Sequence, residues 1–138
     1  MLRATLRAIG ALIAALVLWF VVATIIHRIA CAIWPAYAAA SPLLAFTLPM
    51  MVFRLALSTV CTLLAGTVVQ RLSPIRWLPA AFGCALILLF APEHYRIWSR
   101  LPVWYHLTFL ASLIPLAVLG ARLAATSELG SARMLESQ

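Results

Sequence analysis

Four long apolar stretches, separated by arginine-bearing segments, constrain this chain more than any other feature. They extend over residues 8–26, 49–69, 77–91 and 102–121. About 20 residues of helix, rising about 1.5 Å per residue, cross the roughly 30 Å of hydrocarbon in a bilayer. In the whole sequence 66% of residues are hydrophobic and only 9% are charged, whereas soluble domains carry roughly 25% charged residues. The sequence therefore predicts an all-α integral membrane protein, built as a four-transmembrane-helix bundle.

The chain has room for one domain. Residues 1–122 are expected to form a single four-span transmembrane domain, and residues 123–138 a polar cytoplasmic tail. The segment Ile33–Leu48, between the first two spans, is apolar but interrupted by prolines. It is expected to be a loop or a short interfacial helix rather than a fifth span, because proline disrupts a continuous helix.

The arginines are divided unequally between the two ends of the predicted bundle. On the side of both termini the six are Arg3, Arg7, Arg71, Arg76, Arg122 and Arg133. On the other side the four are Arg28, Arg54, Arg96 and Arg100. Cytoplasmic segments of membrane proteins carry an excess of arginine and lysine. This bias predicts both termini in the cytoplasm, in a multi-pass protein of a bacterial-type inner (plasma) membrane. The net charge of +7 does not indicate a nucleic-acid partner, because the arginines are dispersed.

Arg54 is the one arginine inside an apolar stretch. It follows Pro49 by five residues, which is about 7–8 Å of helix. Its aliphatic stem is therefore expected to carry the guanidinium group outward to the lipid head groups, a behaviour called snorkelling.

The predicted outer face collects the groups that could carry chemistry. The candidate ligand or lipid site there comprises His27, Arg28, Arg54, Glu93, His94, Arg96, Arg100 and His106. Neutral imidazoles bind haem iron, zinc or copper, and a carboxylate can orient the ring. The spacing assigns no metal, because no H-x-x-x-H or E-x-x-H pair occurs on one helix. No cofactor is therefore predicted, and a haem or a metal at the outer face is kept as an alternative. A purely structural alternative for the segment Glu93 to His106 is an interfacial anchor of arginine, tryptophan and tyrosine.

Small residues recur at four-residue intervals in all four spans, a pattern that lets membrane helices approach closely. The predicted helix-packing residues are Gly10, Ala14, Ser58, Thr62, Gly66, Ala81, Ala85, Ala117 and Ala121. These stripes are expected to pack the bundle internally rather than to form an oligomer, because four spans must first pack against each other.

Three classes of function remain open. An accessory or scaffold subunit of a membrane complex, without its own catalysis, needs only apolar surface and interfacial anchors. A small oligomeric transporter or channel normally needs an ionisable group at mid-membrane, whereas the third and fourth spans contain no charged residue. An outer-face redox, metal, haem, quinone or lipid-binding protein would use His27, Glu93, His94 and His106. The sequence favours the accessory subunit over an enzyme. Its expected partners are the lipid bilayer and either other membrane subunits or further copies of this chain.

Overall fold

The computed structural model describes residues 2–136, with side chains described as far as Ser127. In this part of the chain every regular element is helical. The five helices are α1 (Leu2–Ile33), α2 (Pro35–Ala40), α3 (Leu48–Leu72), α4 (Leu78–Arg96) and α5 (Val103–Glu136). Four of them, all except α2, are long and apolar enough to cross a membrane. The prediction of an all-helical protein with four helices of membrane-spanning length is confirmed.

Prolines mark where three of the helices begin. Pro35, Pro49 and Pro79 each occupy the first turn of a helix. A proline costs nothing there, because the first N–H groups of a helix have no partner within it. Proline also disfavours helical geometry in the residue before it, and α1 ends at Ile33, just ahead of Trp34 and Pro35. The segment Ile33–Leu48 therefore contains the short helix α2 and the turn that leads into α3.

The helices are longer than the apolar stretches that predict them. Residues 8–26 lie within α1, for example, which adds nearly two turns at each end. The last stretch, residues 102–121, is part of α5, whose backbone continues as a helix to Glu136. The predicted tail, residues 123–138, therefore begins in helical structure. Residues 137–138 and the side chain of Arg133 lie outside the described part of the chain.

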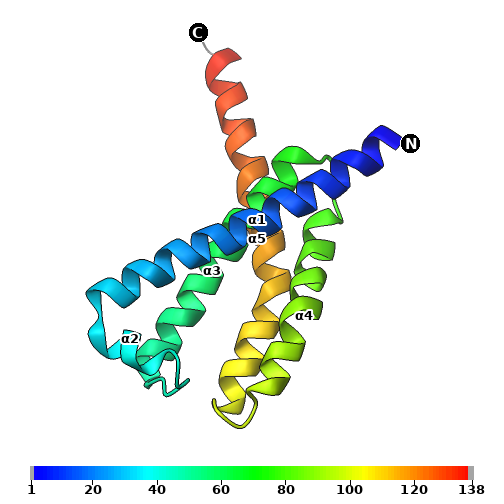
Figure 1. The fold of residues 1–138 in the computed structure, drawn as a ribbon. Helices are drawn as coiled ribbons and strands as arrows, with labels where there is room; N and C mark the ends of the chain where they lie inside the picture. Colours follow the sequence, from blue (N-terminus) through cyan, green and yellow to red (C-terminus); the bar gives the residue numbers. More distant parts are fainter. Residues whose placement is uncertain (1, 137–138) are drawn as a thin grey trace.

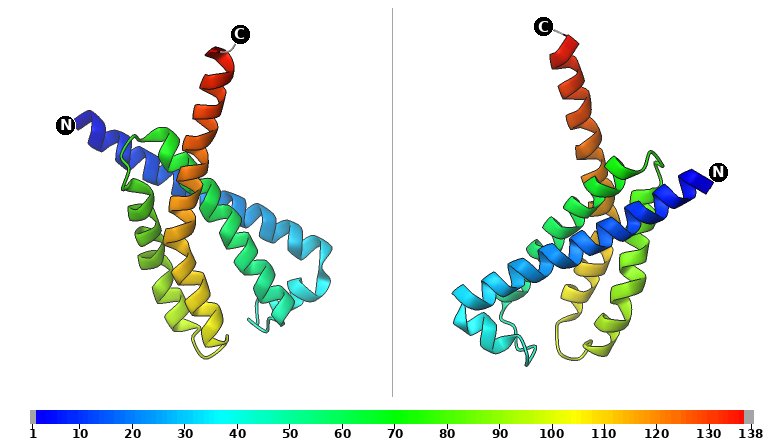
Figure 2. Two further views of the ribbon diagram at one scale, coloured as in Figure 1. Left: turned by 180° about the vertical axis from the view of Figure 1, so that it is seen from behind. Right: turned by 45° about the horizontal axis from the view of Figure 1, so that its top comes forward.

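The helices are arranged in two pairs around a central contact. α3 and α5 share the most extensive contact, α1 packs on α3, and α4 packs on α5. α1 crosses the other helices obliquely (Figure 1). Both ends of the described chain and the turn between α3 and α4 lie at one end of the bundle, here called the terminal end. α2 and the turn between α4 and α5 lie at the opposite end, here called the loop end (Figures 1 and 2).

Glycine allows α5 to approach both of its neighbours closely. A Cβ atom added to Gly66 would overlap the backbone of Ala117, and one added to Gly120 would overlap the backbone of Leu63. On the other side of α5, a Cβ on Gly83 would lie 2.6 Å from the Cα of Ile114. These three contacts leave no space for a side chain. The distance between the helix axes therefore depends on glycine.

The small-residue stripes fall into two groups. Ser58, Thr62, Gly66, Ala117 and Ala121 are buried where the structure packs α3 against α5 and α1. In α1 and α4 the structure corrects the prediction that the small-residue stripes pack the bundle. Gly10 and Ala85 are exposed, and Ala14 and Ala81 are only partly buried.

The buried faces of α1 and α4 are displaced by one residue from the predicted stripes. In α1 the buried positions are Ala11, Ala15 and Trp19, and in α4 they include Phe82 and Leu86. A shift of one residue rotates a helix by about 100°. The physical reason in α1 is Trp19, whose Nε1 donates a hydrogen bond of 3.0 Å to Thr62 Oγ1 of α3. This bond and the ring contact of Trp19 with Phe90, at 4.8 Å, turn the tryptophan face inward.

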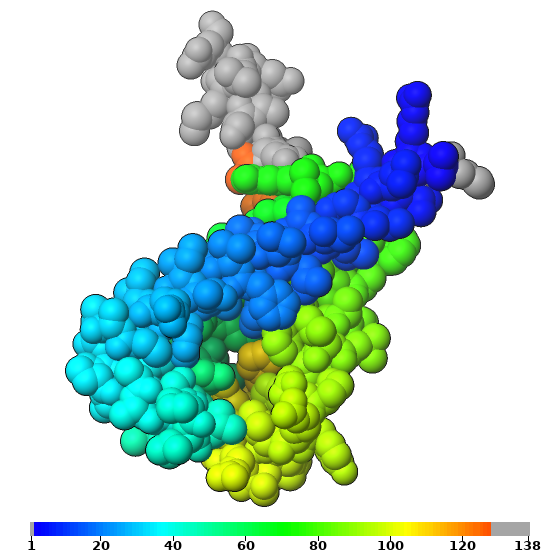
Figure 3. All heavy atoms as spheres, viewed as in Figure 1, coloured from blue at the N-terminus to red at the C-terminus, as the bar shows by residue number. Residues whose placement is uncertain are grey.

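At the loop end the two halves of the molecule separate. Figure 3 shows a hollow on the viewed face between α1 and α2 on one side and α4 on the other. Two small apolar clusters close the bundle around this region. One surrounds Tyr37 of α2, and the other joins Met51 of α3 to Leu101 and Tyr105.

Candidate functional site

The structure divides the eight predicted outer-face residues into two groups. His27, Arg54, His94 and His106 are buried or partly buried at the loop end. Arg28, Glu93, Arg96 and Arg100 are exposed. Glu93 accepts a hydrogen bond of 2.8 Å from Arg96 Nη1, in an ion pair whose side chains are 58% and 74% exposed. Such exposed pairs contribute about 0–1 kcal/mol to stability. The site is therefore built from the first group.

Arg54, in the second turn of α3, is the centre of this group. Its Nε donates a hydrogen bond to Tyr105 Oη and its Nη1 donates one to Tyr37 Oη, both at 3.2 Å. The guanidinium carbon also lies 4.6 Å from the centroid of the Phe46 ring. This differs from the predicted snorkelling. The side chain stays inside the bundle because two phenol oxygens there accept its N–H groups.

The two tyrosines reach Arg54 from opposite halves of the molecule. Tyr37 belongs to α2 and is completely buried, while Tyr105 is in the first turn of α5 and is 3% exposed. Tyr37 is held by ring contacts with Trp34, Phe46 and Phe53. In the sequence, Tyr105 belongs to the segment Glu93 to His106, whose structural alternative is an interfacial anchor, and neither tyrosine is a candidate site residue. Their only sequence signal is that they lie near the same predicted membrane depth as Arg54.

A chain of hydrogen bonds continues from Tyr37 into α1. Because Tyr37 Oη accepts from Arg54, its own hydroxyl is available to donate to His27 Nδ1, 3.2 Å away. With Nδ1 as the acceptor, a neutral His27 carries its hydrogen on Nε2. That nitrogen lies 3.6 Å from Cys31 Sγ, one turn further along α1. The network therefore assigns His27 one tautomer and orients it toward the cysteine.

The other two histidines form a buried pair between α4 and α5. The Nδ1 atoms of His94 and His106 lie 2.9 Å apart, so one ring donates a hydrogen bond to the other. His94 is stacked on Phe109 with a centroid distance of 4.5 Å, and His106 on Trp98 at 4.7 Å. His106 is completely buried, and its Nε2 has no hydrogen-bond partner. A buried ring nitrogen without a partner is costly unless water or a ligand meets it.

The geometry of this pair is that of a hydrogen bond rather than of shared metal ligation. Two nitrogens bound to one tetrahedral zinc, with bonds of about 2.0–2.1 Å, lie about 3.3 Å apart. In the described part of the chain, no group of three or more histidine, cysteine, aspartate or glutamate side chains could hold a metal ion. The side chains at the loop end are therefore hydrogen-bond donors and imidazoles, without the ligand set of a closed metal centre.

The electrostatic balance of the site is one-sided. Before residue 128 the sequence contains a single acidic residue, Glu93, which is exposed and already paired with Arg96. The positive charge of Arg54 acts on both His27 of α1 and His94 of α4. Arginine has five N–H donors, and the bonds to Tyr37 and Tyr105 use two of them. The site therefore offers a positive charge and further N–H donors without a carboxylate to neutralise them.

The comparisons with known proteins find no match, whether to a protein-family model, to a curated protein or to a solved structure.

Proposed function

We propose that this protein is a multi-pass protein of a bacterial-type inner membrane, with both termini in the cytoplasm. The six arginines assigned to the terminal side support this orientation under the positive-inside rule. Exposed aromatic side chains at both ends of the bundle support the placement in a bilayer. Trp77 at the terminal end is 65% exposed, and Tyr95 at the loop end is 82% exposed. Tryptophan and tyrosine are enriched at the two membrane interfaces.

Within this membrane the protein binds an amphiphile, a lipid or a quinone, by its polar head group at the loop end. Arg54 carries the proposal. It lies six residues into α3, which is about 9 Å of helix from the helix start. A guanidinium group that deep is costly unless it is paired. An anionic head group supplies the negative charge that the described side chains around Arg54 do not, and a strongly hydrogen-bond-accepting head group engages its remaining N–H donors.

The surroundings of Arg54 suit a ligand of this kind. Tyr37 and Tyr105 fix the orientation of the guanidinium group from two sides, and the unpartnered Nε2 of His106 lies in the adjoining histidine pair. Figure 3 shows a hollow at the loop end, and we propose that the apolar tail of the ligand lies there. Ligand sites typically combine apolar walls with a few fixed polar groups in this way.

Mass spectrometry of extracted amphiphiles tests the proposal. The full chain is purified in mild detergent, and its bound lipids and quinones are extracted and identified. The wild type is expected to retain one acidic or carbonyl-bearing amphiphile in excess of the bulk membrane composition, and Arg54→Gln is expected to lose it. Arg100→Gln removes an exposed arginine at the same end and is the matched control, expected to retain the ligand. Equal retention by Arg54→Gln and the wild type would refute the Arg54 site.

The role of accessory subunit stays a prediction. The outward face of α1 exposes a stripe of large apolar side chains, which includes Ile9, Ile13 and Val17. Lipid covers such a stripe as well as a protein partner does, so the stripe does not favour one over the other. The transporter class also stays a prediction. A transporter normally needs an ionisable group at mid-membrane, whereas the ionisable side chains of this site are gathered near one end of the bundle.

A further inference from the structure

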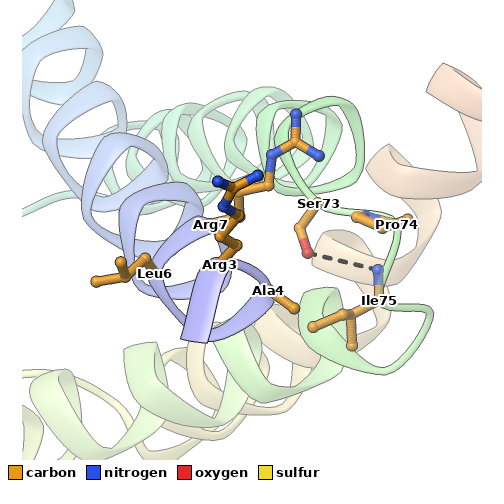
Figure 4. Close-up of a pocket in the computed structure, with 7 residues that line it drawn as sticks. All are labelled: Arg3, Ala4, Leu6, Arg7, Ser73, Pro74 and Ile75. Carbon is orange, nitrogen blue, oxygen red and sulfur yellow. Dashed lines mark hydrogen bonds between the residues drawn. The ribbon is translucent and has the colours of Figure 1, made fainter. Parts of the chain in front are cut away.

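A second site lies at the terminal end, at the opposite end of the bundle from the first. A cavity of about 580 Å³ opens there between the first turns of α1 and the segment that joins α3 to α4. Figure 4 shows Arg3 and Arg7 on one side of this opening and Ser73 on the other. All residues that line the cavity lie outside the four apolar stretches of the sequence. The cavity is therefore expected to lie at the membrane surface, where water-soluble molecules can reach it.

The charged groups of this cavity attract an anion. Arg3 and Arg7 are four residues apart on α1, where Cβ atoms are about 5–6 Å apart and like charges repel each other. Among the residues whose side chains are described, the single acidic one is Glu93, which lies at the loop end. No described carboxylate therefore compensates the two guanidinium groups, and an anion bound between them would.

Ser73 adds a hydrogen-bond donor on the opposite wall. The residue is only 1% exposed, and its Oγ accepts the N–H of Ile75 at 3.4 Å. That bond leaves the hydroxyl hydrogen of Ser73 for another acceptor. Guanidinium groups match the oxygens of a phosphate group, to which they can donate two parallel N–H bonds. The cavity therefore presents phosphate-binding donors from two walls.

The size and the remaining walls of the cavity favour an organic phosphate over inorganic phosphate. A water molecule occupies about 30 Å³ of the liquid, so the cavity is many times larger than a small inorganic ion. Sites for small organic molecules have volumes of about 300–1,000 Å³ and combine apolar walls with a few polar groups. Apart from the two arginines and Ser73, the lining is apolar and consists of Ala4, Leu6, Pro74 and Ile75.

We propose that this cavity binds a phosphate ester. The phosphate group lies between Arg3 and Arg7 and accepts the hydroxyl hydrogen of Ser73, while the organic group packs against the apolar lining. A soluble phosphorylated molecule and the glycerophosphate head group of a lipid share this chemistry. The positive-inside rule accounts for arginines at this end, but it does not require two of them to line one cavity. The site does not depend on the proposed role of Arg54, which lies at the other end of the bundle.

Native mass spectrometry of the full chain in detergent tests this site, with glycerol 3-phosphate, phosphatidylglycerol and inorganic phosphate as separate probes. We expect one or both esters to bind more tightly than inorganic phosphate. Binding of glycerol 3-phosphate supports the site and identifies a soluble ester as its ligand class. Binding of phosphatidylglycerol alone supports the site and identifies a lipid head group. If neither ester binds more tightly than inorganic phosphate, the proposal fails.

Paired substitutions locate the binding of the ester. Arg3→Gln combined with Arg7→Gln is expected to weaken it about twenty-five-fold, since each arginine near an anionic head group contributes about fivefold to affinity. The matched control combines Arg71→Gln with Arg76→Gln. It removes the same charge from exposed positions at the same end, outside the cavity lining, and is expected to weaken binding less than about threefold. Equal weakening in both double variants would indicate a diffuse positive surface and overturn the site.

The apolar lining is tested separately from the charges. Ala4 is exposed and lines the cavity, so Ala4→Phe fills part of it without removing an arginine. This variant is expected to weaken binding of the ester severalfold. Ala4→Ser adds little volume at the same position and is the control, expected to bind like the wild type. If Ala4→Phe also binds the ester like the wild type, the organic group does not occupy the cavity and the proposal is wrong.

Discussion

At the scale of single residues, the most distinctive feature of this bundle is that Arg54 is held inside it between two tyrosines. Lysine in place of Arg54 retains the charge but replaces a planar fork of donors with a single ammonium group. The ammonium cannot donate to Tyr37 and Tyr105 at once with the geometry that the guanidinium uses. The two hydrogen bonds therefore require arginine at this position.

We expect Arg54→Lys to lower the free energy of unfolding by about 2 kcal/mol, the loss of roughly one hydrogen bond to a charged donor. Thermal unfolding in detergent micelles measures this. Arg100→Lys, a change of the same type at an exposed position, is the control and is expected to stay within about 0.5 kcal/mol of the wild type. Indistinguishable melting curves for the two variants would contradict the role of Tyr37 and Tyr105 as partners.

The hydrogen bond between His94 and His106 also links two side chains whose substitutions should not be independent. Replacing either His94 or His106 by leucine leaves the other ring without its 2.9 Å partner, whereas replacing both removes the need for the bond. We expect a double-mutant cycle of His94→Leu and His106→Leu to give a coupling free energy of about 1 kcal/mol, with the double variant more stable than the sum of the single changes predicts. Strictly additive effects would mean that the bond contributes nothing.

At the scale of helices, the contact between α3 and α5 depends on two glycines, each of which faces the backbone of the other helix: Gly66 faces Ala117, and Gly120 faces Leu63. A methyl group on Gly66 would overlap the backbone of Ala117, and this backbone belongs to a packed helix that cannot yield as a flexible side chain would. The close approach also fixes the depth at which Tyr105 of α5 lies beside Arg54 of α3. The helix contact and the site are therefore coupled.

We expect Gly66→Ala to destabilise the protein by about 1–3 kcal/mol, the usual cost of forcing extra volume into a packed contact. Gly10→Ala is the matched control, because a Cβ at Gly10 meets nothing within 4 Å. That change is expected to stabilise α1 by about 0.5–1 kcal/mol, since alanine favours a helix over glycine. Chemical unfolding in detergent measures both variants. A neutral Gly66→Ala would show that the helices can separate without loss.

At the scale of the whole molecule, both ends of the described chain lie at the terminal end, while α2 and the α4–α5 turn lie at the other (Figure 1). We expect a reporter enzyme that is active only outside the cytoplasm to be silent when fused after Gln138. The same reporter inserted after Ser99, in the α4–α5 turn, is expected to be active. Activity of the fusion after Gln138, with silence of the insertion, would reverse the orientation. Arg54 would then face the cytoplasmic leaflet.

The sequence by itself determined that the chain is helical and has four helices long and apolar enough to span a membrane. That information is one-dimensional, since the length of each apolar run and the prolines that begin the helices can be counted along the chain. It also placed Arg54, His94 and His106 near one end. It could not determine the rotation of each helix, because an error of one residue turns a face by about 100°. The stripes in α1 and α4 were displaced for this reason.

Only the tertiary structure decided which polar groups meet. Tyr37 and Tyr105 are 17 and 51 residues from Arg54 in the sequence, and no local pattern pairs them with it. Their meeting depends on α2 folding back against α3 and on glycine bringing α5 close to α3. The same geometry leaves Glu93 outside with Arg96, although the sequence places it next to the buried His94. A charge inside an apolar environment requires a partner, and the packing of the helices determines which residues can supply it.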